Sequence, residues 1–141
     1  MKIFFILGTK AQFIKTIPVI NSAIKNNSEV ILYETGQHPE KAKNLIKKIS
    51  GDFKHVKFVN GTKDIGTYTG LLNLMIVSLF KIIFKKNKNM KDQLCIVHGD
   101  TLSTLIGAFI VKRNKGKLVL LEAGKSFHGM LKHFPESFVR Y

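Results

Sequence analysis

Short apolar runs alternate with longer helical segments along the whole chain, and this alternation constrains the fold more than any other feature. Lys2–Leu7 is an apolar run closed by Gly8 and Thr9, as expected of a buried strand followed by a turn. Further strands are predicted at 29–35, 54–59, 93–98 and 117–121, and helices at 11–25, 39–50, 65–86 and 101–113. Such alternation builds a parallel sheet with helices on its faces. The sequence therefore predicts an α/β fold.

Two helical segments carry a complication. The first contains Pro18, an interior defect that the helix must accommodate. The segment 65–86 is strongly apolar, but Asn73, Ser78 and Lys81 interrupt it, and a bilayer span needs about 20 apolar residues. We therefore expect it to pack against the sheet, with peripheral docking on a membrane surface as the alternative.

The composition fits one domain with its own core, because the chain has 141 residues of which 45% are hydrophobic. We expect residues 1–141 to form that single domain. Cys95 is the one cysteine and lies in an apolar run, so we expect it to be a buried core residue in a reducing cytoplasm. The apolar run after Lys2 is too short for a secretory signal.

The formal net charge of +14 raises the hypothesis of nucleic-acid binding. The charge, however, comes from 21 Lys against 2 Arg, spread along the whole chain, whereas sequence-reading modules rely on arginine forks. We therefore predict no specific nucleic-acid partner. An anionic sugar nucleotide and a charged membrane surface suit the same charge equally well.

Nearly every predicted strand ends in a turn of small or polar residues. These turns are Gly8-Thr9-Lys10, Thr35-Gly36-Gln37-His38, His98-Gly99-Asp100-Thr101 and Glu122-Ala123-Gly124. Because the carboxyl ends of parallel strands meet at one edge of a sheet, we expect these groups to converge on one crevice. The helix starting near Thr101 directs its amides to the same edge, which favours phosphate or carboxylate.

Each turn taken alone has a simpler interpretation. Neither a dinucleotide fingerprint nor a phosphate-cradling loop follows any strand, so classical NAD and ATP sites are not predicted. Asp100 fits an N-cap of the next helix. His98 fits a hydrogen-bonded histidine better than a metal ligand, since the other histidines lack metal spacing, and we predict no metal site. Glu122 follows an apolar run, where an ionised group needs a partner or a purpose.

Five ordered motifs resemble the non-hydrolysing, bacterial-type UDP-N-acetylglucosamine 2-epimerases. They are Gly8-Thr9-Lys10 with Ile14-Lys15 and Pro18-Val19, then Thr35-Gly36-Gln37-His38, Val97-His98-Gly99-Asp100-Thr101, Glu122-Ala123-Gly124, and Pro135-Glu136 with Arg140. The resemblance covers essentially the whole chain. It implies a Rossmann-like parallel sheet with helices on both faces, corresponding to the amino-terminal half of a two-domain glycosyltransferase-B (GT-B) fold.

The resemblance also implies a chemistry and its residues. In such enzymes UDP is eliminated to give a 2-acetamidoglucal and re-added after inversion at C2, which interconverts UDP-N-acetylglucosamine and UDP-N-acetylmannosamine for cell-surface polysaccharide synthesis without a cofactor. The carboxylates that match the catalytic ones are Asp100, Glu122 and Glu136, and the matching substrate contacts are Lys10, Lys15, His98 and Arg140. Gln37 and His38 match a second, regulatory site for the same sugar nucleotide.

The sequence departs from the family pattern in ways that bear on activity. Lys10-Ala11-Gln12 stands where the family has Arg-Pro-Glu, and lysine lacks the bidentate fork of arginine. The loop after Gly124 lacks the family arginine, and Ser137 replaces a second glutamate. We expect the carboxy-terminal, UDP-binding domain to be absent and the chain to be inactive alone. Its expected partners are a separate carboxy-terminal half or a second copy; the alternative is a non-catalytic binding or scaffold module.

Overall fold

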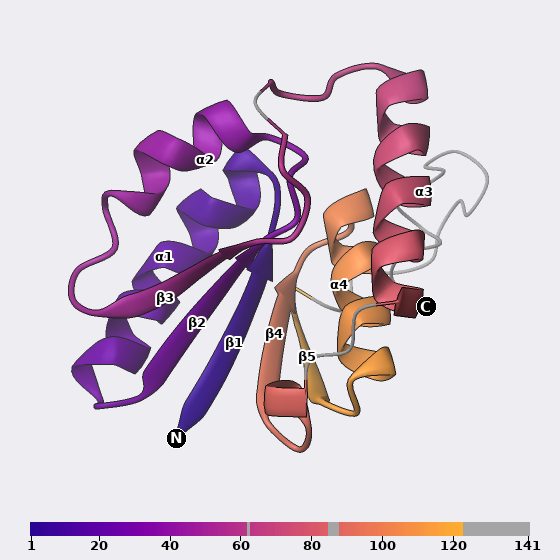
Figure 1. Cartoon of the computed structure of the whole chain (residues 1–141). Helices are drawn as coiled ribbons and strands as arrows, with labels where there is room; N and C mark the ends of the chain where they lie inside the picture. Colours follow the sequence, from indigo (N-terminus) through magenta and orange to yellow (C-terminus); the bar gives the residue numbers. More distant parts are fainter. Residues whose placement is uncertain (62, 85–87, 123–141) are drawn as a thin grey trace.

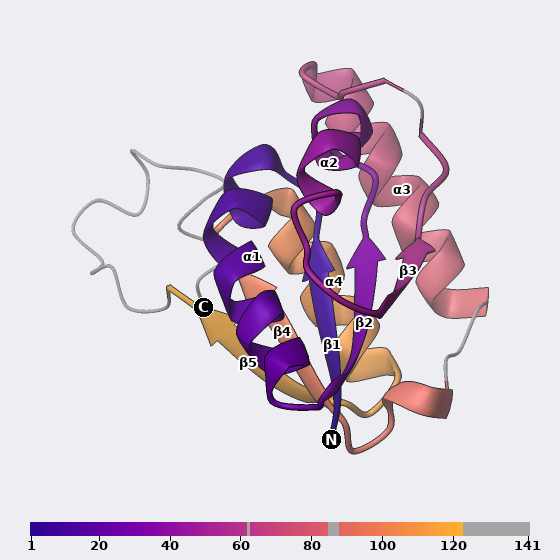
Figure 2. The same cartoon turned by 90° about the vertical axis from the view of Figure 1, so that its left-hand side faces the viewer.

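The computed structural model contains one five-stranded parallel sheet with helices on both faces (Figures 1 and 2). The structure describes residues 1–61, 63–84 and 88–122. The strands are β1 (Lys2–Leu7), β2 (Glu29–Glu34), β3 (Phe53–Lys57), β4 (Leu94–His98) and β5 (Lys117–Leu121). The helices are α1 (Lys10–Lys25), α2 (Pro39–Ile46), α3 (Tyr68–Phe84) and α4 (Leu102–Arg113), with a 3₁₀ turn, η1 (Lys88–Met90), before β4. The predicted α/β fold is confirmed.

The strand order is β3-β2-β1-β4-β5, which makes β1 the central strand. Its residues Phe4, Phe5, Ile6 and Leu7 are fully buried, because a central parallel strand is covered by helices on both faces. Side chains alternate between two core clusters. Phe5 and Leu7 pack with α1 and α2, whereas Phe4 and Ile6 pack with α3 and α4.

Helix α1 runs through Pro18 without a break, as the sequence predicts. Proline removes the hydrogen bond to the carbonyl of Ile14, but both residues lie on the exposed face of the helix, where water is available to that carbonyl. Phe13, Ile17 and Ile20 form the buried stripe. Ile14, which the apolar spacing assigned to the same stripe, is instead 51% exposed.

Helix α4 packs closely on the sheet because its middle residue is Gly107. A Cβ at this position would lie 2.8 Å from Val97 Cγ1 and 3.1 Å from Ile6 Cγ2. The glycine therefore lets the helix backbone approach β1 and β4. This contact fixes the amino-terminal end of α4 above the carboxyl ends of these two strands.

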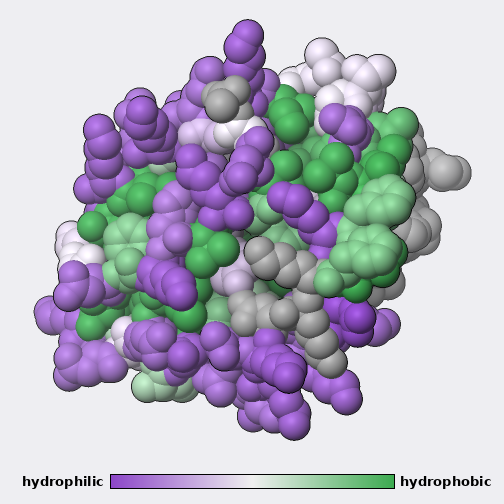
Figure 3. All heavy atoms as spheres, in the orientation of Figure 1, coloured by the Kyte–Doolittle hydropathy of each residue, from purple (hydrophilic) through white to green (hydrophobic). Residues whose placement is uncertain are grey.

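Helix α3 packs through one face and leaves the opposite face exposed. Leu74, Ser78 and Ile82 are its buried residues, so the prediction that it packs on the fold holds for this face. The other face carries the α3 stripe, which we define as Tyr68, Leu72, Ile76, Phe80, Ile83 and Phe84, all of them exposed. Hydrophobic residues gather over α3 in Figure 3. Within the described ranges, no helix is both long and apolar enough to cross a bilayer.

Candidate functional site

The two loops that follow β1 and β4 lie side by side at the carboxyl edge of the sheet. The chain leaves β1 into α1, which covers one face, and leaves β4 into α4, which covers the other. Neighbouring parallel strands whose connections diverge in this way form a topological switch point, where open α/β sheets bind their ligands. The predicted convergence of strand-end residues is thus confirmed for Gly8, Thr9, His98 and Thr101.

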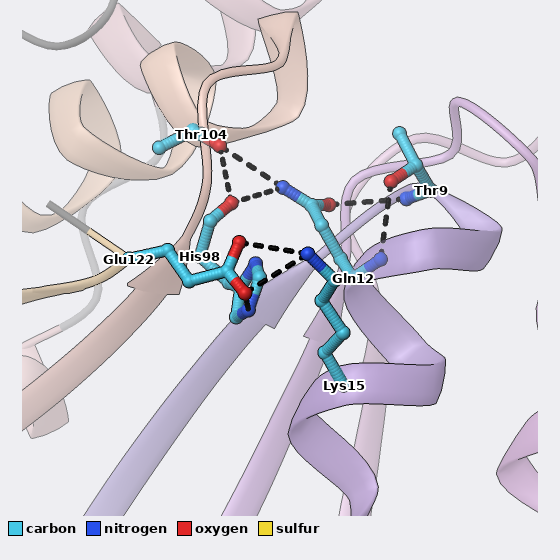
Figure 4. Close-up of polar contacts among 6 residues, drawn as sticks. All are labelled: Thr9, Gln12, Lys15, His98, Thr104 and Glu122. Atoms are coloured by element: carbon cyan, nitrogen blue, oxygen red, sulfur yellow. Dashed lines mark hydrogen bonds and ion pairs between the residues drawn. The ribbon is translucent and has the colours of Figure 1, made fainter. Parts of the chain in front are cut away.

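Gln12 holds these two loops together from inside the protein (Figure 4). Its side chain is buried, and its Oε1 accepts from the backbone N–H groups of Gly8 at 2.8 Å and Thr9 at 3.1 Å. Its Nε2 donates to the carbonyl oxygen of His98 at 2.6 Å and to the Thr104 hydroxyl at 2.9 Å. With Thr9 as N-cap, Gln12 also completes a capping box at the start of α1.

Lys15, Glu122 and His98 form a polar cluster beside this amide (Figure 4). Lys15 Nζ donates to both carboxylate oxygens of Glu122 at 2.9 Å. His98 Nε2 lies 3.8 Å from Glu122 Oε1. The Lys15 and Glu122 side chains are 52% and 49% exposed, whereas that of His98 is 6% exposed. The cluster thus combines an exposed ion pair with a buried imidazole.

The pKa of His98 is lowered from its ordinary value, chiefly because burial disfavours the charged imidazolium. The carboxylate of Glu122 raises this pKa and the ammonium of Lys15 lowers it, so the two members of the ion pair oppose each other. His98 is therefore a neutral hydrogen-bonding group near pH 7. Glu122 itself has a left-handed backbone, with φ of 60°, a conformation that is uncommon for a non-glycine residue.

A second polar chain lies beneath the loop between β2 and α2. The Thr35 hydroxyl donates to Ser103 Oγ at 2.9 Å, and the Ser103 hydroxyl donates to Gln37 Oε1 at 2.6 Å. His38 follows, and its backbone N–H donates to the carbonyl of Gly8 at 2.9 Å. Burial, followed by the charge of Lys41, lowers the pKa of His38. The regulatory role of Gln37 and His38 stays a prediction.

Asp100 and Lys10 lie at the starts of the two helices that begin at this edge. Thr101, rather than Asp100, is the N-cap residue of α4, so the simpler interpretation of Asp100 as a helix cap is wrong. The chain turns at Gly99, with φ of 72°, and this places Asp100 one residue before the cap. Lys10 is the exposed first residue of α1. Glu136 and Arg140 lie outside the described residues.

Sequence reasoning missed Gln12, Ser103 and Thr104 as site residues. One signal was available for Gln12, because a threonine followed three residues later by glutamine is the pattern of a capping box. Nothing in the local sequence indicates that the same amide reaches His98 and Thr104, which are 86 and 92 positions away. For Ser103, the only indication is its place in the first turn of the helix after β4.

Comparisons with known proteins place this edge in context. No family model matches the chain. It is 32% identical over 126 residues to a UDP-N-acetylglucosamine 2-epimerase homolog of Methanococcus maripaludis, a match that covers 88% of this chain and 33% of the relative. The chain is a homologue of UDP-N-acetylglucosamine 2-epimerases. It spans about a third of the length of the curated relatives that it matches.

Two further epimerases are similar to the chain in fold or in sequence. The Methanocaldococcus jannaschii UDP-GlcNAc 2-epimerase, solved in complex with UDP-GlcNAc and UDP, superposes with a TM-score of 0.68 at 25% identity and covers 99% of this chain and 37% of its own. A UDP-2,3-diacetamido-2,3-dideoxy-D-glucuronate 2-epimerase of Pseudomonas aeruginosa is 31% identical over 133 residues, which are 91% of this chain and 35% of that protein. The Rossmann-like sheet is therefore one that GT-B epimerases contain.

Proposed function

We propose that this chain is the amino-terminal, sugar-nucleotide-binding domain of a UDP-N-acetylglucosamine 2-epimerase. The observation that carries the proposal is the cluster of Lys15, Glu122 and His98 at the switch point of a sheet homologous to such epimerases. The cluster supplies a cation, a carboxylate and a neutral imidazole within a few ångströms of one another. These are the group types that elimination of UDP and proton transfer at C2 require.

In this proposal each residue type has a distinct task. Lys15 and Lys10, with Arg140, neutralise the departing diphosphate, and the amino-terminal end of α4 favours the same anion. Glu122, Asp100 and Glu136 move the C2 proton and assist at the sugar oxygens. His98 offers a neutral hydrogen bond to substrate. Because Lys15 pairs with Glu122 here, a bound diphosphate competes with that carboxylate for the lysine.

The substrate class is a UDP-activated 2-acetamido sugar, and the product feeds cell-surface polysaccharide synthesis in the cytoplasm. The Pseudomonas aeruginosa relative is named for a diacetamido uronate. The affinity of the chain for UDP-N-acetylglucosamine should therefore be compared directly with its affinity for an acidic 2,3-diacetamido analogue. Tighter binding of the acidic sugar would move the proposal to that substrate, with the site residues unchanged.

We further propose that residues 1–141 bind substrate weakly and do not turn it over alone, because closure of a second domain supplies the remaining contacts and excludes water. The test is an assay of UDP-N-acetylglucosamine conversion with the 141-residue chain alone and then with the carboxy-terminal two thirds of a relative added. We expect conversion only in the mixture. Ordinary enzymatic turnover by the chain alone would contradict this part of the proposal.

The lysine at position 10, where the resemblance has an arginine with its bidentate fork, favours one alternative, a non-catalytic sugar-nucleotide-binding or scaffold module. This alternative predicts ligand binding with no conversion in either arm of the same assay. A mixture that converts substrate and loses conversion with Glu122→Gln favours the enzyme. A mixture that never converts it, while ligand still binds, favours the module.

The α3 stripe supports self-association as the mode of assembly. The Phe80 and Phe84 rings of the stripe stack with centroids 6.4 Å apart. Lys81, the one basic residue of helix α3, lies outside the stripe and donates to the carbonyl of Phe58. Exposed apolar residues that gather on one helix face are typical of interaction sites. We propose a second copy of the chain as the occupant, with a separate carboxy-terminal half making its contacts at the carboxyl edge of the sheet.

A further inference from the structure

We propose that Gln12 is a positioning residue that sets the geometry of the sugar-nucleotide site by locking the loop after β1 to the loop after β4. The inference rests on the function proposed above. Gln12 is 2% exposed and lies one helical turn before Lys15 on α1. It is therefore sealed from substrate and acts through the groups that it holds.

The contacts of Gln12 require an amide with a donor at one end and an acceptor at the other. Its Oε1 faces two backbone N–H groups, those of Gly8 and Thr9. Its Nε2 faces the carbonyl of His98. The Thr104 hydroxyl donates to this same carbonyl at 2.7 Å, so it presents a lone pair to the amide. If the amide were flipped, its NH₂ group would face the N–H donors of Gly8 and Thr9, and its oxygen would face the carbonyl oxygen of His98.

The locked carbonyl connects Gln12 to the reactive cluster. The peptide unit after His98 includes the N–H of Gly99, which donates to the carbonyl of Leu121 at 3.0 Å, directly before Glu122. Gln12 thus fixes the backbone that bears the His98 ring and, through Gly99, the end of β5. Lys15, on the same helix, meets Glu122 from the other side. One turn of α1, from Gln12 to Lys15, therefore positions both His98 and Glu122.

Position 12 is also where this sequence departs from the resemblance, which has glutamate in place of Gln12. A carboxylate at position 12 would place a negatively charged oxygen against the carbonyl oxygen of His98, which lies 2.6 Å from Gln12 Nε2 in this structure. The two oxygens would repel each other. A protonated carboxyl would instead donate to that carbonyl as the amide does. Burial and the carbonyl favour the protonated form of such a carboxyl, and the Gly8 and Thr9 N–H groups on its other oxygen favour the ionised form. Gln12→Glu therefore makes the site geometry depend on pH.

The test uses the full 141-residue chain and compares Gln12→Glu with Asn21→Asp. Asn21 is an amide on the same helix whose Oδ1 accepts from the Ser50 N–H, away from the site. The readouts are the hydrogen-exchange rate of the Gly99 amide by NMR, that of the core Phe5 amide, and calorimetric titration with UDP-N-acetylglucosamine. Each is measured at about pH 5 and about pH 8, and recovery at the lower pH reports protonation of the introduced carboxyl.

At the higher pH, Gln12→Glu is expected to speed Gly99 exchange about tenfold or more relative to the unsubstituted chain. Ligand affinity should fall by a similar factor. Both effects should disappear at the lower pH, while Phe5 exchange and the Asn21→Asp chain stay unchanged throughout. Equal Gly99 exchange in the two chains at both pH values, or loss of protection at Phe5 together with Gly99, would overturn the positioning role. If the unsubstituted chain binds no UDP-N-acetylglucosamine, the proposed function fails, yet the Gly99 and Phe5 rates still decide the role of Gln12.

Discussion

Lys15 donates to both carboxylate oxygens of Glu122, each at 2.9 Å, across 107 positions of sequence. This pair joins the helix after β1 to the residue that follows β5, and the buried ring of His98 lies beside it. The pair is about half exposed, so its contribution to folding stability is small. Its importance lies in the charge that it presents to a ligand and to His98.

The pKa of His98 reports on this ion pair. Lys15→Gln removes a cation that lowers the pKa and leaves the Glu122 charge that raises it, so the pKa should rise; Glu122→Gln should lower it. Because the folded-state pKa lies below the unfolded value of about 6.5, stability is lost as pH falls from that value toward the folded pKa. NMR titration of the His98 ring checks the directions, with Lys25→Gln at the far end of α1 as control. Identical titration in all chains would exclude the coupling.

Gly8 is required for the close approach of the loop after β1 to the polar chain beneath it. A Cβ at this position would overlap the hydroxyl groups of Thr35 and Ser103. Gly8→Ala should therefore lower the free energy of unfolding by about 1–3 kcal/mol, as overpacking of a core does. Urea denaturation measures it. Gly66→Ala, whose Cβ would meet nothing within 4 Å, is the matched control, and an equal effect of the two changes would argue against this close approach.

The α3 stripe should drive self-association. Replacing Phe80, which is 59% exposed and stacked on Phe84, with serine should shift the chain from dimer to monomer in sedimentation equilibrium. Val19→Ser, at an exposed position of α1 on the other face of the sheet, should leave the dimer intact. A monomeric parent chain would refute self-association. Binding of that monomer to anionic vesicles, lost with Phe80→Ser, would instead assign the stripe to a membrane surface.

Cys95 should resist thiol reagents in the folded protein. Its side chain is fully buried in the core, as the sequence predicts, and burial raises the pKa of the thiol to about 11. Because the thiolate is the reactive form, labelling at about pH 8, below that pKa, should wait for unfolding. Mass spectrometry after iodoacetamide treatment, with and without urea, measures this. Complete labelling of the native chain would contradict the burial of Cys95.

The apolar run of β1 predicted that strand well, because a parallel strand buried on both faces leaves a continuous signal. The bounds of β1 and β5 agree with the expectation, and α2 ends at Ile46, earlier than the expected 50. The convergence of strand ends also followed from the fold class, since parallel strands share one edge. The exposure of Ile14 did not follow, because helical spacing alone does not fix how far a buried stripe extends around a helix.

The contacts inside the site could not be predicted from the sequence, for a different reason. Gln12 and Ser103 act through side-chain hydrogen bonds to residues that are distant in the sequence, and such contacts leave no period and no local composition. Glu122 was predicted as a member of the crevice, and Lys15 only as a substrate contact that the resemblance implies. The short contact between the two depends on the left-handed backbone of Glu122, which turns the residue that follows β5. Such a conformation is set by tertiary packing.

Calorimetric titration of the 141-residue chain with UDP-N-acetylglucosamine tests the central claim most directly. The account predicts saturable binding that weakens strongly with Lys15→Gln, because the diphosphate loses the cation that Glu122 holds in the free protein, and that stays unchanged with Lys25→Gln. Absence of binding to the unsubstituted chain, or equal affinity in the Lys15→Gln chain, would contradict the assignment of this edge as the sugar-nucleotide site.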